Sequence, residues 1–239
     1  MTPDDLCFMP ASELAPLFRG KKLSPVELCE AVLARVERLE PKLNAFVVWD
    51  GDAAMDQARA AEQALTSGQN VGPLTGMPVT IKDLAVTADL PTQRGSMTMK
   101  GEVFGADTPF VTRLREAGAV VLGKTTTSEF GWKGVSHAPL TGITHNPWKQ
   151  GFNAGASSAG AGVAAAAGYG PFHQGSDGAG SIRMPSHFCG IFGIKPSFGR
   201  VPSWPVGNSD QVSHIGPMTR SVMDSALMLK TMAGPHHLD

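Results

Sequence analysis

The sequence predicts an α/β fold, because helical and apolar extended segments alternate along it and the chain can bury a core. The clearest alternation is a helix that opens at Thr108-Pro109, turns at Gly118 and leads directly into the apolar run Ala119–Leu122. Of the 239 residues, 42% are hydrophobic and 17% are charged, which suits a globular chain. No repeat, charge block or linker divides the chain. We therefore expect one domain over residues 1–239, with N-terminal helices over about 1–70 and a core over about 71–239.

The N-terminal segment begins with a capped helix and leads to a strand that carries a lysine. Ser24-Pro25-Val26-Glu27 combines an N-cap serine, a proline at the first helical position and a glutamate two residues later, which is typical of a capping box. Apolar residues follow at helical spacing, and we expect Pro41 to end this helix. The run from Pro78 to Ile81 is a short β-branched strand that delivers Lys82 at its end. Between these segments we expect an extended run and an alanine-rich helix, over residues 45–49 and about 52–66.

The second half of the chain is rich in small residues. A loop of serine, alanine and glycine over residues 155–162 runs into an alanine helix that ends at Gly168. Such a loop permits close backbone approach and presents the N–H groups of a helix N-terminus. After it we expect an extended run, a glycine loop, an apolar strand and a last helix, at Pro171–Gln174, Gly175–Ser181, Cys189–Ile194 and Thr219–Gly234.

Charge and cysteine content exclude several classes of function. The net charge of −1 and the pI near 6.7 give no reason to expect direct binding to nucleic acid or to an anionic membrane. The three cysteines have no paired spacing, so neither a disulfide framework nor a CxxC metal site is expected. We therefore expect a cytoplasmic location. No run of 18 apolar residues predicts a membrane span, and the first ten residues do not resemble a signal peptide.

The best candidate for chemistry is Ser181, which directly follows Gly178-Ala179-Gly180. Consecutive small residues can direct their N–H groups to one point, and such a nest suits an oxyanion. A serine hydroxyl also needs a base to take its proton. The seven histidines stand in no triad context, and neither a G-x-S-x-G elbow nor a metal-binding motif occurs. On composition alone, close helix packing is the simpler interpretation of the small-residue run.

Several blocks, in order over nearly the whole chain, resemble the amidase signature family. The serine- and glycine-rich signature matches 155–160 and 175–185 and continues as Phe188-Cys189-Gly190-Ile191-Phe192-Gly193-Ile194-Lys195-Pro196-Ser197. Upstream, Gly76-Met77-Pro78-Val79-Thr80-Ile81-Lys82-Asp83 resembles the lysine motif of the family. A further block runs from Thr108-Pro109 through Leu122-Gly123-Lys124-Thr125 to Glu129-Phe130.

The resemblance implies a mixed β-sheet covered by helices on both faces and a Ser–cis-Ser–Lys triad. By position, Ser181 matches the nucleophile, Ser157 the bridging serine and Lys82 the base. The main-chain N–H groups that match the oxyanion hole are those of Gly178, Ala179, Gly180 and Ser181. A lysine acts as a base only when neutral, and burial lowers its pKa because desolvation penalises the ammonium. Neither a metal nor another cofactor is implied.

Other residues of these blocks receive secondary roles. Asp177 and Arg183 are expected to hold the glycine loop, and Lys124 and Lys195 to brace the fold. Ala156, Ala159 and Ala179 stand where glycine is usual, a change that affects substrate preference more than the reaction. The candidate lining of the substrate pocket is Ser158, Phe130, Gly131, Trp132 and Trp204.

Three functions fit these residues. The first is an amide hydrolase that frees a carboxylate and ammonia or an amine from a small-molecule amide. The second is the glutamine-hydrolysing subunit of an aminoacyl-tRNA amidotransferase, and the third is a non-catalytic scaffold that keeps the fold. Family members are roughly twice this length, so we expect a missing C-terminal half, a second chain or homo-oligomerisation to complete the molecule.

Overall fold

The computed structural model describes residues 2–206 and 210–239. Within them the helices are α1 (Pro3–Phe8), α2 (Ala11–Arg19), α3 (Pro25–Leu43), α4 (Gly51–Thr66), α5 (Pro109–Glu116), α6 (Ala159–Ala167), α7 (Arg183–Cys189) and α8 (Val222–Met232). Short 3-10 turns lie at η1 (Met97–Met99), η2 (Glu129–Gly131) and η3 (Asp210–Val212). No helix in this part of the chain combines the length and apolar character that crossing a bilayer requires.

A mixed sheet of six strands forms the centre of the molecule, in the order β1-β3-β2-β8-β10-β9. Its strands are β1 (Phe46–Trp49), β2 (Pro78–Lys82), β3 (Val120–Thr125), β8 (Phe172–Asp177), β9 (Phe192–Gly193) and β10 (His214–Thr219). β2 runs parallel to β3 and β8, whereas β1 and β10 run antiparallel to their neighbours. Two small hairpins pair β4 (His137–Ala138) with β5 (Gly142–Ile143) and β6 (His145–Asn146) with β7 (Lys149–Asn153).

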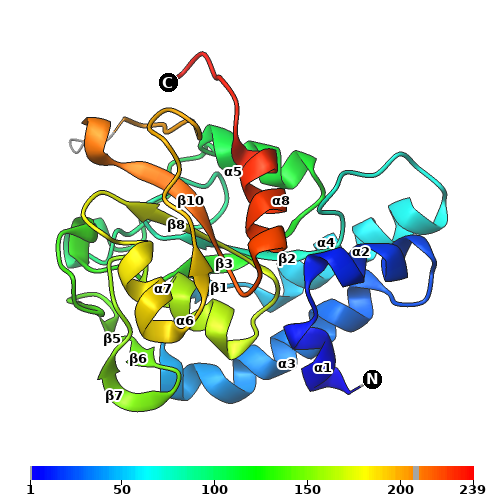
Figure 1. The fold of residues 1–239 in the computed structure, drawn as a ribbon, viewed down its shortest axis with the longest axis horizontal. Coiled ribbons are helices and arrows are strands. Elements are labelled where there is room, and N and C mark those ends of the chain that lie inside the picture. Colours follow the sequence, from blue (N-terminus) through cyan, green and yellow to red (C-terminus); the bar gives the residue numbers. More distant parts are fainter. Residues whose placement is uncertain (1, 207–209) are drawn as a thin grey trace.

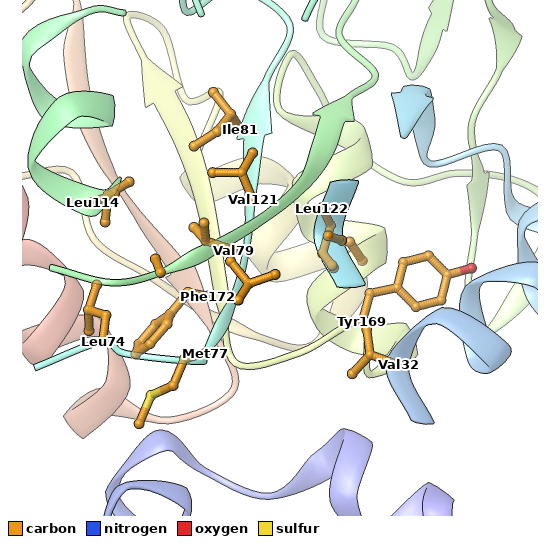
Figure 2. Packing of buried hydrophobic residues seen from close by; sticks show 14 of the residues in the cluster. Val32, Leu74, Met77, Val79, Ile81, Leu114, Val121, Leu122, Tyr169 and Phe172 are labelled. Atoms are coloured by element: carbon orange, nitrogen blue, oxygen red, sulfur yellow. The ribbon is translucent and has the colours of Figure 1, made fainter. Parts of the chain in front are cut away.

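Helices cover both faces of this sheet, as expected (Figure 1). α6 packs on β2, β3, β8 and β10, while α8 packs on β8, β9 and β10 with α5 beside it. The core between these layers is apolar and includes Val79, Ile81, Val121, Leu122 and Phe172 (Figure 2). β2 and β3 are buried at every position, which is typical of parallel strands enclosed on both faces. The mixed sheet and its helical layers confirm the predicted fold class.

Two helix ends differ from the sequence-based expectation. Pro41 does not end α3, which continues to Leu43, because a proline in the last turn removes only one backbone hydrogen bond. The helix ends instead at Asn44, whose left-handed backbone has φ 53°. α8 begins after Ser221 and not at Thr219, since Thr219 is still paired in β10.

Two strands also differ. α7 runs through Cys189 and is capped by Gly190, which has φ +70°. The predicted apolar strand over Cys189–Ile194 therefore shrinks to the two residues of β9. β8 runs past Gln174 to Asp177, into the predicted glycine loop, because it pairs with β10 along that whole length. This longer strand brings Ser176 and Asp177 to the site described next.

Candidate active site

Lys82 ends strand β2 with its side chain fully buried. Its Nζ donates hydrogen bonds to Ser157 Oγ at 2.7 Å and to Ser176 Oγ at 3.0 Å. Its main-chain N–H donates to Gln174 Oε1 at 2.9 Å, which fixes the end of β2 against β8. Burial lowers the pKa of Lys82 to about 7, although the charge of Asp177 opposes this shift. Near neutral pH, a large fraction of this amine is therefore uncharged and able to accept a proton.

Ser157 and Ser158 lie in the loop that enters α6. The peptide bond before Ser157 is cis, and Ser158 is the N-cap of the helix. Ser158 is fully buried, and its Oγ donates to Ser176 O at 3.1 Å while accepting from Ser176 N at 3.2 Å. The main-chain N–H of Ser158 donates to Ser181 O at 3.2 Å. The loop thus brings Ser157 beside Lys82 and joins its own backbone to Ser181, while the Ser158 hydroxyl is engaged by the backbone of β8.

Asp177 organises the turn that carries Ser181. Its carboxylate accepts the N–H groups of Gly180, Ile182 and Arg183 at 2.7, 3.2 and 3.3 Å. The Arg183 guanidinium donates to it at 2.9 and 3.0 Å. Burial opposes the negative charge, yet these donors hold the pKa of Asp177 well below its usual range. Asp177 and Arg183 make the loop-holding contacts expected from the sequence.

The Asp177 contacts also bear on the predicted oxyanion hole. Because the Gly180 N–H already donates to a carboxylate, a developing oxyanion would rely on Gly178, Ala179 and Ser181. Ala179 is exposed, and Gly178 and Ser181 are partly exposed. The three remaining N–H groups therefore belong to residues that solvent or a substrate can reach.

The predicted pocket residues fall into two groups. Gly131 is next to the serines, since a Cβ at this position would lie 3.3 Å from Ser157 Oγ and 2.8 Å from Leu84 Cδ1. Its chain neighbours Phe130 and Trp132 are 49% and 86% exposed. Trp204 is instead bonded through its main-chain N–H to Thr108 Oγ1, at the start of α5, at 3.4 Å.

Two polar residues of the site were not singled out from the sequence. Ser176 provides the second hydroxyl on Lys82, and Gln174 holds the lysine backbone. Both lie on β8, and the feature of the sequence that indicates this strand is the extended run that begins at Pro171. Gly175 favours a loop, so the strand was expected to end before it and not at Asp177. In residues 2–206 and 210–239, no group of three or more His, Cys, Asp or Glu is arranged to hold a metal ion.

Comparisons with known proteins give consistent matches. A family model described as Amidase matches residues 27–239. An acylamidase from Rhodococcus erythropolis is 43% identical over 240 residues, which cover 100% of this chain and 50% of that protein. One of the subunits of glutamyl-tRNA(Gln) amidotransferase from Methylococcus capsulatus is 41% identical over 224 residues, covering 93% and 46%.

The fold gives the same result. The solved structure of a bacterial aryl acylamidase belonging to the amidase signature enzymes aligns with a TM-score of 0.90 and 33% identity, over 97% of this chain and 49% of that one. The chain spans about half the length of the curated relatives it matches.

Proposed function

Because this chain belongs to the amidase signature family, we propose that it hydrolyses a carboxamide to a carboxylate and ammonia or an amine through an acyl-enzyme on Ser181. The observation that carries the proposal is the buried Lys82 amine, 2.7 Å from Ser157 Oγ. The backbone bond from Ser158 to Ser181 supports it, because that bond holds the bridging serine close to the nucleophile. The similarity to an acylamidase supports the same reaction class.

The first chemical step needs a proton path away from the nucleophile. Neutral Lys82 takes the proton of Ser157, and Ser157 takes the proton of Ser181 as the Ser181 oxygen attacks the amide carbon. The C=O π electrons move to oxygen, and the N–H groups of Gly178, Ala179 and Ser181 stabilise the resulting oxyanion. Lys82 then carries the extra proton as an ammonium.

The tetrahedral intermediate collapses when its nitrogen is protonated. Ser157 passes a proton to the departing nitrogen and recovers one from Lys82, so the C–N bond breaks to give a neutral amine or ammonia. Water then adds to the acyl-enzyme while the same relay accepts its proton. Returning that proton to the Ser181 oxygen releases the carboxylic acid and restores the neutral lysine.

A second candidate function is glutamine hydrolysis within a tRNA-dependent amidotransferase. It is favoured by the 41% identity to one component of such an enzyme. The two functions share the reaction and differ in the substrate and in the fate of ammonia. Glutaminase activity that rises on addition of partner subunits would favour this second candidate over a free-standing amidase.

We further propose a cytoplasmic protein completed by another polypeptide segment or a second copy of the chain. The three cysteines, Cys7, Cys29 and Cys189, are buried free thiols, which fits a reducing compartment. A non-catalytic scaffold is disfavoured because the lysine and both serines are present, Lys82 is hydrogen-bonded to Ser157, and the main-chain N–H of the next residue, Ser158, donates to Ser181 O.

The direct test is ammonia or amine release across a panel of amides that includes glutamine and aryl acetamides. We expect turnover of at least one amide, acyl transfer to added hydroxylamine, and loss of both reactions in Ser181→Ala. Arg59→Ala, which removes an exposed cation of α4, is the control and should retain activity. Turnover that survives in Ser181→Ala would contradict the acyl-enzyme mechanism.

A further inference from the structure

A buried ion pair includes the residue that follows the proposed base in the chain. Asp83 follows Lys82 in the chain, and its Oδ1 is 3.7 Å from Nζ of Lys124, which belongs to the adjacent strand β3. Both side chains are fully buried. Burying two charges is costly, and replacing such a pair with apolar residues often leaves stability unchanged or improves it. The pair therefore needs a reason other than its net contribution to stability.

Both charges are directed at one segment, residues 87–95, which we call the strap. Asp83 accepts the main-chain N–H groups of Gln93 and Gly95 at 3.0 and 3.3 Å. Lys124 Nζ donates to strap oxygens, at 2.7 Å to Thr92 Oγ1, 3.3 Å to Pro91 O and 3.4 Å to Thr87 Oγ1. Burial raises the pKa of Asp83 to about 6 and lowers that of Lys124 to about 8, so both groups are mainly charged at pH 7.

The strap in turn holds the segment beside the serines, η2 (Glu129–Gly131). Arg94 O accepts the N–H of Phe130 at 2.8 Å, and Ser96, next to the strap, donates its hydroxyl to Glu129 Oε1 at 2.8 Å. Arg94 and Phe130 have φ of 53° and 49°. Residues other than glycine rarely adopt this left-handed backbone conformation, so it persists only where surrounding contacts impose it.

The last link is the contact with the relay. A Cβ on Gly131 would lie 3.3 Å from Ser157 Oγ, so a small displacement of η2 reaches the bridging hydroxyl. We infer that Asp83 and Lys124 are positioning residues, which hold η2 against Ser157 through the strap and thereby align the relay to Ser181. The effect on η2 stands on contacts alone, whereas the effect on reaction rate rests on the proposed function.

Thr92 allows a mild test, because its hydroxyl accepts the shortest hydrogen bond from Lys124. Thr92→Val removes the hydroxyl at nearly constant volume, and Thr92→Ser keeps it. Thr75→Val is the matched control, since Thr75 is also buried and its hydroxyl donates to main-chain oxygens. Thr75 precedes the start of β2, whereas Lys82 and Asp83 are at the end of that strand. Two quantities are measured on each purified protein: amide hydrogen exchange of residues 128–132, and the rate at which a fluorophosphonate probe labels Ser181.

We expect Thr92→Val to speed exchange at Phe130 and to slow labelling about tenfold, since small misplacements of reacting groups are costly. Thr92→Ser and Thr75→Val should stay within about twofold of the parent protein in both measurements. Asp83→Asn should have a larger effect in the same direction; if it does not fold, the Thr92 variants decide the question.

The outcomes separate this inference from the proposed function. Unchanged exchange at residues 128–132 in folded Thr92→Val would overturn the positioning role of the pair. If the parent protein were not labelled at all, the proposed nucleophile would fail, while hydrogen exchange would still test the hold on η2. Faster exchange with unchanged labelling would overturn the link from η2 to the relay.

Discussion

Two buried lysines at the ends of neighbouring parallel strands have different polar neighbours. Lys82 Nζ contacts the hydroxyls of Ser157 and Ser176, which carry no charge. Lys124 Nζ is 3.7 Å from the Asp83 carboxylate, which stabilises its ammonium form. Of the two, Lys82 can therefore release its proton at lower cost, and it is the one beside a serine that directly precedes the N-cap of α6.

The pH dependence of the reaction should follow from this environment. The proposed base works as a neutral amine, and its pKa is about 7. We therefore expect kcat/KM to rise with pH through that region on the acidic side and to level off above it, because protonated Lys82 cannot accept a proton. The measurement is an amide-hydrolysis profile from about pH 5 to about pH 9, two pH units either side of that pKa.

Lys82→Arg should lower this activity about a thousandfold or more, since a guanidinium does not give up its proton near neutral pH. Urea unfolding of Lys82→Arg measures any damage to folding separately from the loss of activity. A Lys82→Arg protein with substantial activity would remove lysine from the mechanism.

The two adjacent serines should differ in what they contribute. Ser157→Ala removes the proton path and should lower turnover by orders of magnitude with little change in the free energy of unfolding. Ser158→Ala removes two hydrogen bonds to the backbone of Ser176, so it should lower the free energy of unfolding by about 1–3 kcal/mol. Its loss of activity should be smaller than that of Ser157→Ala. Turnover and urea unfolding of both variants check this, and the reverse order of the two activity losses would move the bridging role to Ser158.

At the scale of an element, α6 depends on its small residues for close approach to the sheet. A Cβ on Gly160 would lie 2.1 Å from Ala45 O and 2.5 Å from Thr126 N, both backbone atoms. A Cβ on Gly162 would lie 3.0 Å from the nearest atom, Pro185 Cβ. The N-terminal turn of the helix therefore has no room for a side chain at position 160.

We expect Gly160→Ala to destabilise the protein by about 3 kcal/mol, because the helix must move off the sheet backbone. Gly162→Ala should stay within about 1 kcal/mol of the parent, since the helix propensity of alanine offsets the tighter contact. Urea unfolding measures both free energies. Equal effects of the two substitutions would show that the packing of α6 against the backbone at Ala45 and Thr126 is looser than described.

The elements that the sequence predicts best are those with local causes. The capping box at Ser24–Glu27 and the helix–turn–strand from Thr108 to Leu122 depend on neighbours in the chain, and the structure contains both. The length of β8 was missed because its pairing with β10, about 40 residues away, decides it. Ser176 was missed as a site residue for the same reason. Gln174 lay inside the predicted run, but its contact with Lys82 depends on the pairing of β8 with the distant strand β2. The triad positions came from family motifs, since no local pattern joins Lys82 to Ser157.

At the scale of the whole molecule, the sheet ends in the two-residue strand β9, and apolar side chains are exposed nearby. Phe198 is 56% exposed and lines an open groove of about 530 Å³ with Ile194, Pro196 and Leu229. An open sheet edge beside exposed apolar groups favours association. We expect light scattering to give a mass above the 25.0 kDa of the single chain.

Phe198→Ser should lower that mass toward the monomer, because it removes a large exposed apolar side chain from the groove. Trp132→Ser, which removes an exposed aromatic residue next to the site, is the comparison and should leave the mass unchanged. A fully active monomer of 25.0 kDa would refute the association.

The proposed proton relay joins parts of the chain that are distant in sequence. Lys82 and Ser157 are 75 positions apart, and Lys82 and Ser176 are 94 apart, whereas the caps of α1 and α3 close within three residues. Contacts between distant residues form late, because loop-closure entropy is lost before they contribute. A folding intermediate with all its helices but no pairing of β2 with β8 would hold every residue of the relay and none of its chemistry. Activity in this mechanism would therefore require the pairing of β2 with β8.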